Sequence, residues 1–215
     1  MEESSAIGEE VWEAHSNNEK YTYKPTQWWS LYKRDIARYK GYRGEKPFLV
    51  IYLTEPGLQA LLQYRIAASI YLSRLPRLLK APLMVLAVIW LKIIEMTVGI
   101  SIPYRTTIGP GFYIGHFGNI FLNEDVVIGH TCNISQGVTI GLSGRGENYG
   151  SPTIGNRVYI ATNAVVVGKI TVGDDAVIAA NSLVTADVAP HTTVIGVPAQ
   201  FKNNHGSKVY IEPHH

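Results

Sequence analysis

The chain has 215 residues, which is enough for one large domain or two small ones. Its formal net charge of +2 is too small to predict a nucleic-acid partner, and its single cysteine excludes a disulfide framework. The lone cysteine and an N-terminal segment that does not look like a signal peptide lead us to expect a reducing, cytoplasmic location.

The first segment of the chain is acidic. Six glutamates and no lysine or arginine fall within residues 1–19. A segment of this composition cannot bury enough apolar surface to fold alone, so we expect residues 1–24 to form a disordered acidic tail.

Residues 25–100 are expected to form a helical domain. A first helix is predicted from Thr26, whose hydroxyl can cap it, to the glycines at 41 and 44. Residues 46–53 suit either a strand or the approach to a helix. A second helix is predicted from Thr54, with Pro56 in its first turn, to about Leu75.

A third helix is predicted over residues 81–99, and it is apolar on nearly all sides. Its longest uninterrupted apolar stretch, 81–91, is shorter than the ~18–20 residues that a membrane-spanning helix needs. The favoured interpretation is burial against the other helices or in a subunit interface. The alternative is a peripheral contact with a membrane surface through 81–99, with Arg74, Arg77 and Lys80 near the lipid headgroups.

Beyond the helices, a six-residue repeat dominates the sequence. Small or aliphatic residues follow four places after each repeated position, with Gly, Asn, Asp and Thr between them. A period of six matches neither an α-helix nor a flat sheet, and it predicts a parallel β-helix at 101–200, followed by a polar tail at 201–215. The clearest run of repeated aliphatic positions is Ile154, Ile160, Val166, Val172, Ile178 and Val184.

The six-residue period is interrupted twice. It begins at Ile102 and slips by two places between Ile114 and Leu122, so two extra residues must protrude there. It breaks again over residues 141–153, a polar, Gly-rich loop that we expect to project from the solenoid. Interruptions of a regular solenoid are where functional residues tend to lie.

His116 lies in the first interruption, so its side chain is not committed to the interior. An imidazole there is suited to act as a general base toward a hydroxyl, although a surface histidine at a turn fits the spacing as well. We interpret His130 and His191 as structural corner residues and Cys132 as an inert thiol in an inward slot. A metal site would need a third ligand near His116 and His130. None is evident, so we expect no metal.

Three stretches resemble the hexapeptide-repeat acyltransferases, and within them the serine acetyltransferase branch. They are EPGLQALLQYRIAASIYL at 55–72, GFYIGHFGNIFLNEDVVIGHTCNISQGVTIG at 111–141 and APHTTVIGVPAQ at 189–200. The resemblance covers about residues 25–202. It implies an α+β chain in which the N-terminal helical domain precedes a left-handed parallel β-helix. It also implies a homotrimer with active sites shared between subunits, and a dimer of trimers is left open.

The same resemblance implies acetyl-CoA as the co-substrate and places His116 on the family's general base. The acetyl-CoA arm would lie in the groove between two β-helices, held by backbone groups at coil corners that small residues leave accessible. The matching positions are Gly141, Leu142, Ala161, Thr162, Ala179, Ala180, Gly196, Val197 and Pro198.

Three departures from the serine acetyltransferase pattern concern the acceptor. The family carries Asp fifteen residues before the catalytic His, Asp directly before it, and Arg-His ahead of the proline at the end of the long loop. This chain has Ser101, Gly115 and Gly150-Ser151 there. Because partners for an ammonium and a carboxylate are missing, we expect a neutral sugar or glycan hydroxyl as acceptor. The 141–153 loop resembles the variant in acetyltransferases of polysaccharide assembly.

Several polar residues are candidates for the missing roles. Ser101, Asn119, Asn123 and Glu124 are candidates to orient His116, as is a backbone carbonyl. Arg145 and Glu147 are candidates to recognise the acceptor, or are solvated loop residues.

The sequence therefore predicts an O-acetyltransferase that moves acetyl from acetyl-CoA to a hydroxyl of a small-molecule or glycan acceptor. His116 would take the hydroxyl proton and return it to the leaving thiolate, and an N–H donor near Gly141 would stabilise the oxyanion. Two alternatives stay open. One is a serine O-acetyltransferase of cysteine biosynthesis, and the other is a catalytically silent trimer that binds a partner or a membrane.

Overall fold

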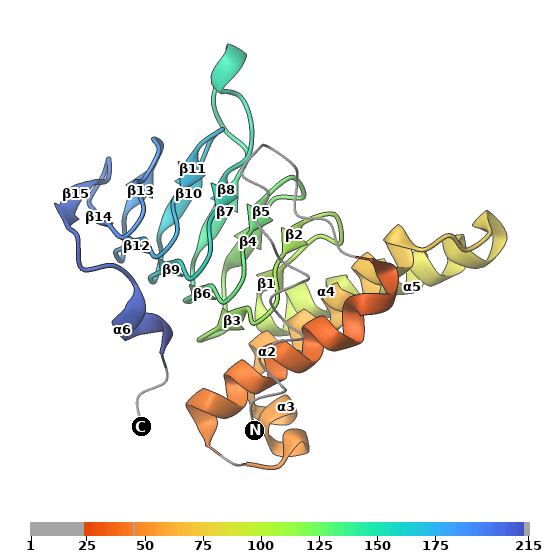
Figure 1. Ribbon diagram of the computed structural model, residues 1–215. Helices are drawn as coiled ribbons and strands as arrows, with labels where there is room; N and C mark the ends of the chain where they lie inside the picture. The colour runs from red at the N-terminus through yellow and green to blue at the C-terminus, as the bar shows by residue number, and fades with distance from the viewer. Residues whose placement is uncertain (1–23, 45, 213–215) are drawn as a thin grey trace.

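A computed structural model describes residues 24–44 and 46–212 of the protein, so the expected acidic tail lies outside the described residues apart from Lys24. Figure 1 shows a group of helices from the N-terminal half beside a stack of short strands from the C-terminal half. The predicted order, a helical domain followed by a parallel β-helix, is confirmed.

The helical domain departs from the predicted helix starts in two places. Thr26 lies in a 3₁₀ turn and does not cap the first helix. The second helix follows Glu55, because the Thr54 hydroxyl donates instead to the carbonyl oxygen of Val50, at 2.8 Å, within a separate short helix. Residues 46–53 therefore belong mostly to a helix. The elements are η1 (Pro25–Gln27), α2 (Trp28–Arg43), α3 (Phe48–Thr54), α4 (Pro56–Leu72) and α5 (Arg77–Val98).

Helix α5 is longer and less buried than the sequence analysis predicted. It begins at Arg77 and continues through Pro82. Gln63 of α4 donates to the carbonyl oxygen of Ala87 at 3.0 Å, which fixes one side of α5 to α4. The other helices therefore bury only one side of α5, and burial of the rest in a subunit interface stays a prediction. Within the described residues, α5 is also the one helix long and apolar enough to cross a membrane by length and composition. Its buried side chains are Ala87, Leu91 and Ile94.

The C-terminal half winds into coils that each contribute strands to three sheets (Figure 1). Sheet A contains β1 (Ile100–Ser101), β4 (Ile120–Leu122), β7 (Thr139–Gly141), β10 (Val165–Val167) and β13 (Leu183–Val184). Sheet B contains β2 (Thr107–Ile108), β5 (Val127–Ile128), β8 (Thr153–Ile154) and β11 (Thr171–Val172). Sheet C contains β3 (Tyr113–Ile114), β6 (Asn133–Ile134), β9 (Tyr159–Ile160), β12 (Val177–Ile178), β14 (Thr193–Ile195) and the antiparallel β15 (Gln200–Asn203).

The residues predicted to point inward are buried and stacked coil upon coil. In sheet C the parallel register aligns Ile114, Ile134, Ile160 and Ile178. Both predicted interruptions are confirmed, the first between β3 and β4 and the second between β7 and β8. The second contains η2 (Gly146–Asn148) and projects from the solenoid in Figure 1, and two backbone hydrogen bonds between residues 143 and 150 narrow its base.

The first coil has no coil beneath it, so β2 and β3 turn one row of backbone N–H and C=O groups toward the helical domain. Tyrosines of α4 and α2 pair with these groups. The Tyr64 hydroxyl accepts from the N–H of Ile108 at 3.1 Å and donates to the carbonyl of Thr106 at 2.7 Å. The Tyr39 hydroxyl accepts from the N–H of Ile114 at 3.1 Å and donates to its carbonyl at 3.2 Å. Each hydroxyl supplies the hydrogen-bond partners that a neighbouring strand would otherwise provide.

A fully buried ion pair completes this contact. Arg65 of α4 and Asp35 of α2 are both 0% exposed, and two guanidinium nitrogens contact the carboxylate at 2.9 and 3.2 Å. Arg65 also donates to the carbonyls of Ile108 and Gly109 at 2.6 and 2.7 Å, and Asp35 accepts from the N–H of Phe112 at 3.0 Å. The pair therefore joins α2, α4 and the first coil.

The C-terminal segment was expected to be a polar tail at 201–215, but residues 201–212 contain a strand and a short helix. Phe201 pairs with Val194 in the β14–β15 ladder. A short helix, α6 (Lys208–Ile211), follows, and Ser207 and Ile211 beside and within it are buried. Residues 213–215 lie outside the described residues. Because residues 201–212 are mostly polar and follow no repeat, their sequence did not show that a few of these side chains are buried.

We expect Arg65→Met to lower the free energy of unfolding by about 3–5 kcal/mol, because the Asp35 carboxylate would stay buried without its counter-ion. Urea unfolding followed by circular dichroism measures this loss. The matched control is Arg105→Met, which removes an exposed contact of 3.3 Å with Glu124 and should cost at most about 1 kcal/mol. Equal losses in the two variants would contradict the central role of the buried pair.

The thiol of Cys132 fills an inward slot and is 1% exposed, and burial raises its pKa to about 12. We expect no reaction with an aromatic disulfide reagent at about pH 8 while the protein is folded, because the reactive thiolate is scarce and shielded. One thiol per chain should react after denaturation in guanidinium chloride. Rapid labelling of the folded protein would show that this part of the shaft opens.

Candidate active site

One edge of the β-helix gathers most of the predicted site. We call it the C/A edge, because there each coil turns from sheet C to sheet A. Backbone hydrogen bonds hold successive turns in register: Gly115 N–H to Ile134 carbonyl at 2.9 Å, and Ala161 N–H to Ile178 carbonyl at 2.9 Å. The structure thereby brings together these predicted residues: His116, Asn119, Ala161, Thr162, Ala179, Ala180, Gly196, Val197 and Pro198.

His116 stands on the turn that carries the two extra residues, and its side chain is exposed. Gly118 and Asn119 complete the turn with φ values of +102° and +55°, a left-handed region that glycine and asparagine enter at least cost. The helical domain supports this turn, since the carbonyl of Gly99 at the end of α5 accepts from the N–H of Ile120 at 3.0 Å. The position of His116 therefore depends on both domains.

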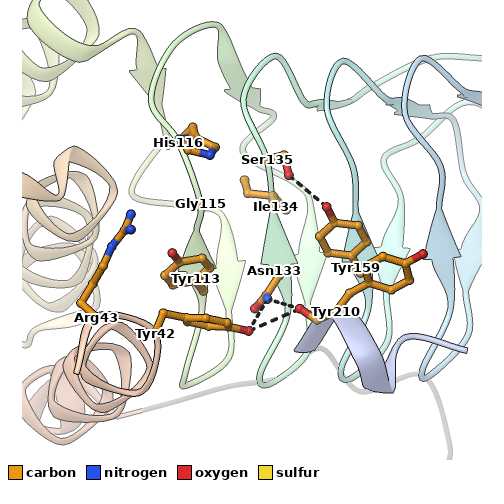
Figure 2. A pocket seen from close by; sticks show the side chains of 10 residues that line it. All are labelled: Tyr42, Arg43, Tyr113, Gly115, His116, Asn133, Ile134, Ser135, Tyr159 and Tyr210. Carbon is orange, nitrogen blue, oxygen red and sulfur yellow. Dashed lines mark hydrogen bonds between the residues drawn. The ribbon is translucent and has the colours of Figure 1, made fainter. Parts of the chain in front are cut away.

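His116 borders a pocket of about 230 Å³, which Figure 2 shows from close by. Helix α2, sheet C and the C-terminal segment all contribute to its walls. Four tyrosines offer aromatic faces and hydroxyl groups. Among the lining residues, Arg43 is the one permanent cation and none is acidic. The lining consists of Tyr42, Arg43, Tyr113, Gly115, His116, Asn133, Ile134, Ser135, Tyr159 and Tyr210.

Arg43 is held in place by Glu55. Its Nε lies 2.6 Å from one carboxylate oxygen and its Nη2 donates to the other at 3.2 Å. The hydrogen bond to Glu55 raises the pKa of Arg43, so the guanidinium stays charged. In Figure 2 it points toward the His116 side of the pocket. Its side chain is 38% exposed, which leaves N–H groups for an acceptor carboxylate.

A distant segment of the chain closes one side of the pocket. The ring of Tyr210 stacks on Tyr159, with centroids 4.6 Å apart and planes 5° from parallel. The carbonyl of Tyr210 accepts from Nδ2 of Asn133 at 3.0 Å, and the carbonyl of Ile211 accepts from the hydroxyl of Tyr42 at 2.5 Å. The sequence did not predict these tyrosines, because nothing in the six-residue period shows that the C-terminal segment returns to sheet C.

Five other predicted residues lie on a different edge. We call it the A/B edge, because the chain turns there from sheet A to sheet B. Gly141 and Leu142 end β7 on this edge, Glu124 lies on the turn beneath them, and the loop with Arg145 and Glu147 projects from it. Within one chain, these five residues are separated from His116 by the length of a sheet A strand.

Most candidates for orienting His116 are engaged elsewhere. Glu124 faces Arg105 at 3.3 Å, and the amide oxygen of Asn123 accepts from Ser151 at 3.0 Å, both at the A/B edge. Asn119 shares the turn of His116. The structure therefore places Asn119 near His116 and leaves Asn123 and Glu124 away from it.

Ser101 contacts a carboxylate that was not among the predicted site residues, that of Glu95. The Ser101 hydroxyl donates to Glu95 at 2.7 Å, and Lys92 contacts the other oxygen of Glu95 at 2.6 Å. Burial by itself would raise the pKa of Glu95, but the hydrogen bonds from Lys92 and Ser101 outweigh it, so the pKa is lowered. Glu95 lies one helical turn before Gly99, which supports the His116 turn. It thus supplies a carboxylate beside the position where the resemblance led us to expect Asp.

His130 and His191 behave as corner residues. Nδ1 of His130 lies 3.2 Å from the hydroxyl of Thr131, and burial, together with Arg157, lowers the pKa of His130. His191 lies 3.7 Å from the carboxylate of Asp175. Over residues 24–44 and 46–212, no three His, Cys, Asp or Glu side chains gather where they could hold a metal ion.

Comparisons with known proteins agree with this geometry. Residues 151–186 match the family model described as bacterial transferase hexapeptide (six repeats). The chain is 35% identical to a serine acetyltransferase of Bacillus pumilus over 170 residues, which cover 79% of this chain and 75% of that protein. It resembles the crystal structure of Neisseria gonorrhoeae serine acetyltransferase in complex with serine, with a TM-score of 0.70, 29% identity and coverage of 83% and 70% of the two chains. The crystal structure of the Brucella abortus serine acetyltransferase in complex with coenzyme A matches with a TM-score of 0.73 and 25% identity. The match covers 85% of this chain and 70% of that one.

These comparisons correct one expectation and support others. The resemblance to acetyltransferases of polysaccharide assembly is not supported, and neither is a sugar or glycan acceptor. The left-handed β-helix, the acyltransferase activity and acetyl-CoA as co-substrate are confirmed. The chain therefore belongs to the serine acetyltransferase family of hexapeptide-repeat, acetyl-CoA-dependent O-acyltransferases.

Proposed function

We propose that this protein transfers the acetyl group of acetyl-CoA to the hydroxyl of free serine, with His116 as the general base. The observation that carries the proposal is the position of His116. It is the histidine that borders the pocket, on the turn that interrupts the period, in a chain that matches a serine-bound serine acetyltransferase over 83% of its length.

In this mechanism His116 accepts the proton of the acceptor hydroxyl as the oxygen attacks the thioester carbonyl. When the carbon–sulfur bond breaks, His116 returns that proton to the leaving thiolate and ends neutral. A covalent acyl-enzyme through the chain's one thiol is not expected, because Cys132 is buried.

We also propose that the complete site forms between two subunits of a homotrimer. The small residues at 161 and 179 stack along the C/A edge and leave backbone groups accessible to an extended acetyl-CoA arm. Gly141, Leu142 and the projecting loop with Arg145 and Glu147 would come from the A/B edge of a neighbouring subunit. An N–H donor near Gly141 would then reach the developing oxyanion from that side.

A second candidate acceptor is a hydroxyl compound without an ammonium group. The pocket favours it, because Arg43 can meet a carboxylate while no lining residue is acidic. Serine and this alternative share the same chemistry at His116. They differ in that serine carries an ammonium group, which needs a negatively charged partner, and the alternative does not.

The first test is release of free thiol from acetyl-CoA with serine as acceptor. We expect His116→Ala to lower kcat/KM by about 10²–10⁴-fold, the range typical of losing a general base. The matched control is His130→Ala at a regular coil corner, which should retain activity. Glycolate, glycerol and simple hexoses serve as acceptors without an amine.

The outcomes separate the candidates. Turnover with serine that depends on His116 supports the proposal, whereas turnover confined to acceptors without an amine supports the second candidate. No turnover with any acceptor, together with intact binding of coenzyme A, would contradict serine acetylation and favour a silent trimer.

A mixing experiment tests the shared site. Subunits with His116→Ala and subunits with Gly141→Trp, each inactive alone, are unfolded together in equal amounts and refolded. If each site combines His116 of one subunit with residue 141 of the next, random trimers regain about a quarter of the wild-type activity per site. Sites contained within single subunits would give no recovery of activity, which would contradict the proposal. As a control, the two variants refolded separately and then combined without subunit exchange should also stay inactive.

A further inference from the structure

The outward face of α5 is largely apolar, with Lys92 as an exposed cation within it. Exposed side chains recur at helical spacing, and Leu78 near its start and Met96 near its end are each 86% exposed. Soluble monomers rarely leave a continuous apolar patch of this extent uncovered. The exposed apolar residues of this stripe are Leu78, Leu79, Leu83, Val85, Leu86, Val88, Ile89, Ile93 and Met96.

The charge around this stripe has one sign up to Ile94. No aspartate or glutamate occurs between Glu55 and Glu95 in the sequence. The cations of this interval that lie near the α4–α5 junction are Arg74, Arg77 and Lys80, and both arginines are exposed. Lys80 donates to the carbonyl of Ser73 at 3.0 Å, which holds its charge at the junction.

The shape of the domain presents these residues outward. Figure 1 shows the α4–α5 junction projecting past the other helices and away from the β-helix. Leu72, Leu75, Leu78 and Leu79 are all exposed on this projection, interleaved with the cations. A projection that alternates leucines and cations matches a lipid interface, where apolar side chains enter the acyl region and cations meet phosphate groups.

Helix α5 is fixed on its other side, which argues against insertion across a bilayer. Gln63 donates a hydrogen bond to the Ala87 carbonyl, and Glu95 accepts one from the hydroxyl of Ser101 in the first strand. Spanning a membrane would break both contacts and place Lys92 and Glu95 in the apolar layer. Lying flat on a surface keeps every contact and buries the stripe.

We propose that the α5 stripe and the cationic α4–α5 junction dock this protein on an anionic membrane surface as a peripheral protein. The apolar stripe supplies the insertion, and Arg74, Arg77 and Lys80 supply the selectivity for negative headgroups. This inference does not depend on the acceptor or on His116.

Cosedimentation of the full chain with vesicles tests the proposal. We expect binding to vesicles of phosphatidylcholine with phosphatidylglycerol, and at least roughly tenfold weaker binding to phosphatidylcholine alone. Arg74→Gln with Arg77→Gln should weaken binding to the anionic vesicles by roughly thirtyfold, from the loss of two headgroup contacts. Leu78→Gln with Leu79→Gln should weaken it to a similar degree.

The matched control is Leu49→Gln with Leu53→Gln on α3. These leucines are 63% and 65% exposed, and the helix that carries them, α3, lies away from the junction in Figure 1, so the control should bind as the wild type does. Circular dichroism and thiol release confirm that each variant folds. Absent binding, or equal binding to both vesicle types, would overturn the proposal. So would a smaller oligomer for the Leu78 and Leu79 variant without vesicle binding, because the face would then belong to a second copy of the chain.

Discussion

The unpaired backbone edge of the first coil is the constraint on which the rest of this structure depends. A parallel solenoid needs hydrogen-bond partners beneath its first strands, since buried N–H and C=O groups without partners are costly. The helical domain provides them through Tyr39, Tyr64 and the Asp35–Arg65 pair. A buried ion pair alone adds little stability, but here the guanidinium also binds two strand carbonyls. It therefore fixes how the helices sit under the solenoid.

This arrangement explains why the candidate site lies at the first coil. His116 needs a turn with two extra residues, and such a turn loses the regular support of the ladder. The end of α5 replaces that support through the Gly99 carbonyl, and α2 brings Arg43 to the pocket. At the C/A edge the higher coils carry regular turns with small residues. The first coil is thus where the solenoid can hold an irregular, functional turn.

The sequence predicted those features that repeat along the chain. The spacing of Ile154 to Val184 located the coils, and the slip between Ile114 and Leu122 located His116, because inward positions must be aliphatic. It could not predict contacts between segments without a shared period. The stacking of Tyr210 on Tyr159 joins a C-terminal helix to a strand of sheet C, and the hydrogen bond from Ser101 to Glu95 joins a strand to α5. Neither pair of elements shares a repeat. The sequence left both burial and exposure open for α5, because a helix that is apolar all round gives no sign of which side is covered.

The two interruptions of the period also bear on assembly. A β-helix is rigid because backbone ladders tie each coil to the next, so it cannot bend to bring two of its edges together. His116 lies on the C/A edge, while the 141–153 loop leaves from the A/B edge. Three-sided prisms packed around a threefold axis place one edge of each subunit against a different edge of its neighbour. If both interruptions serve one reaction, rigidity of the single chain requires that a neighbouring subunit completes the site.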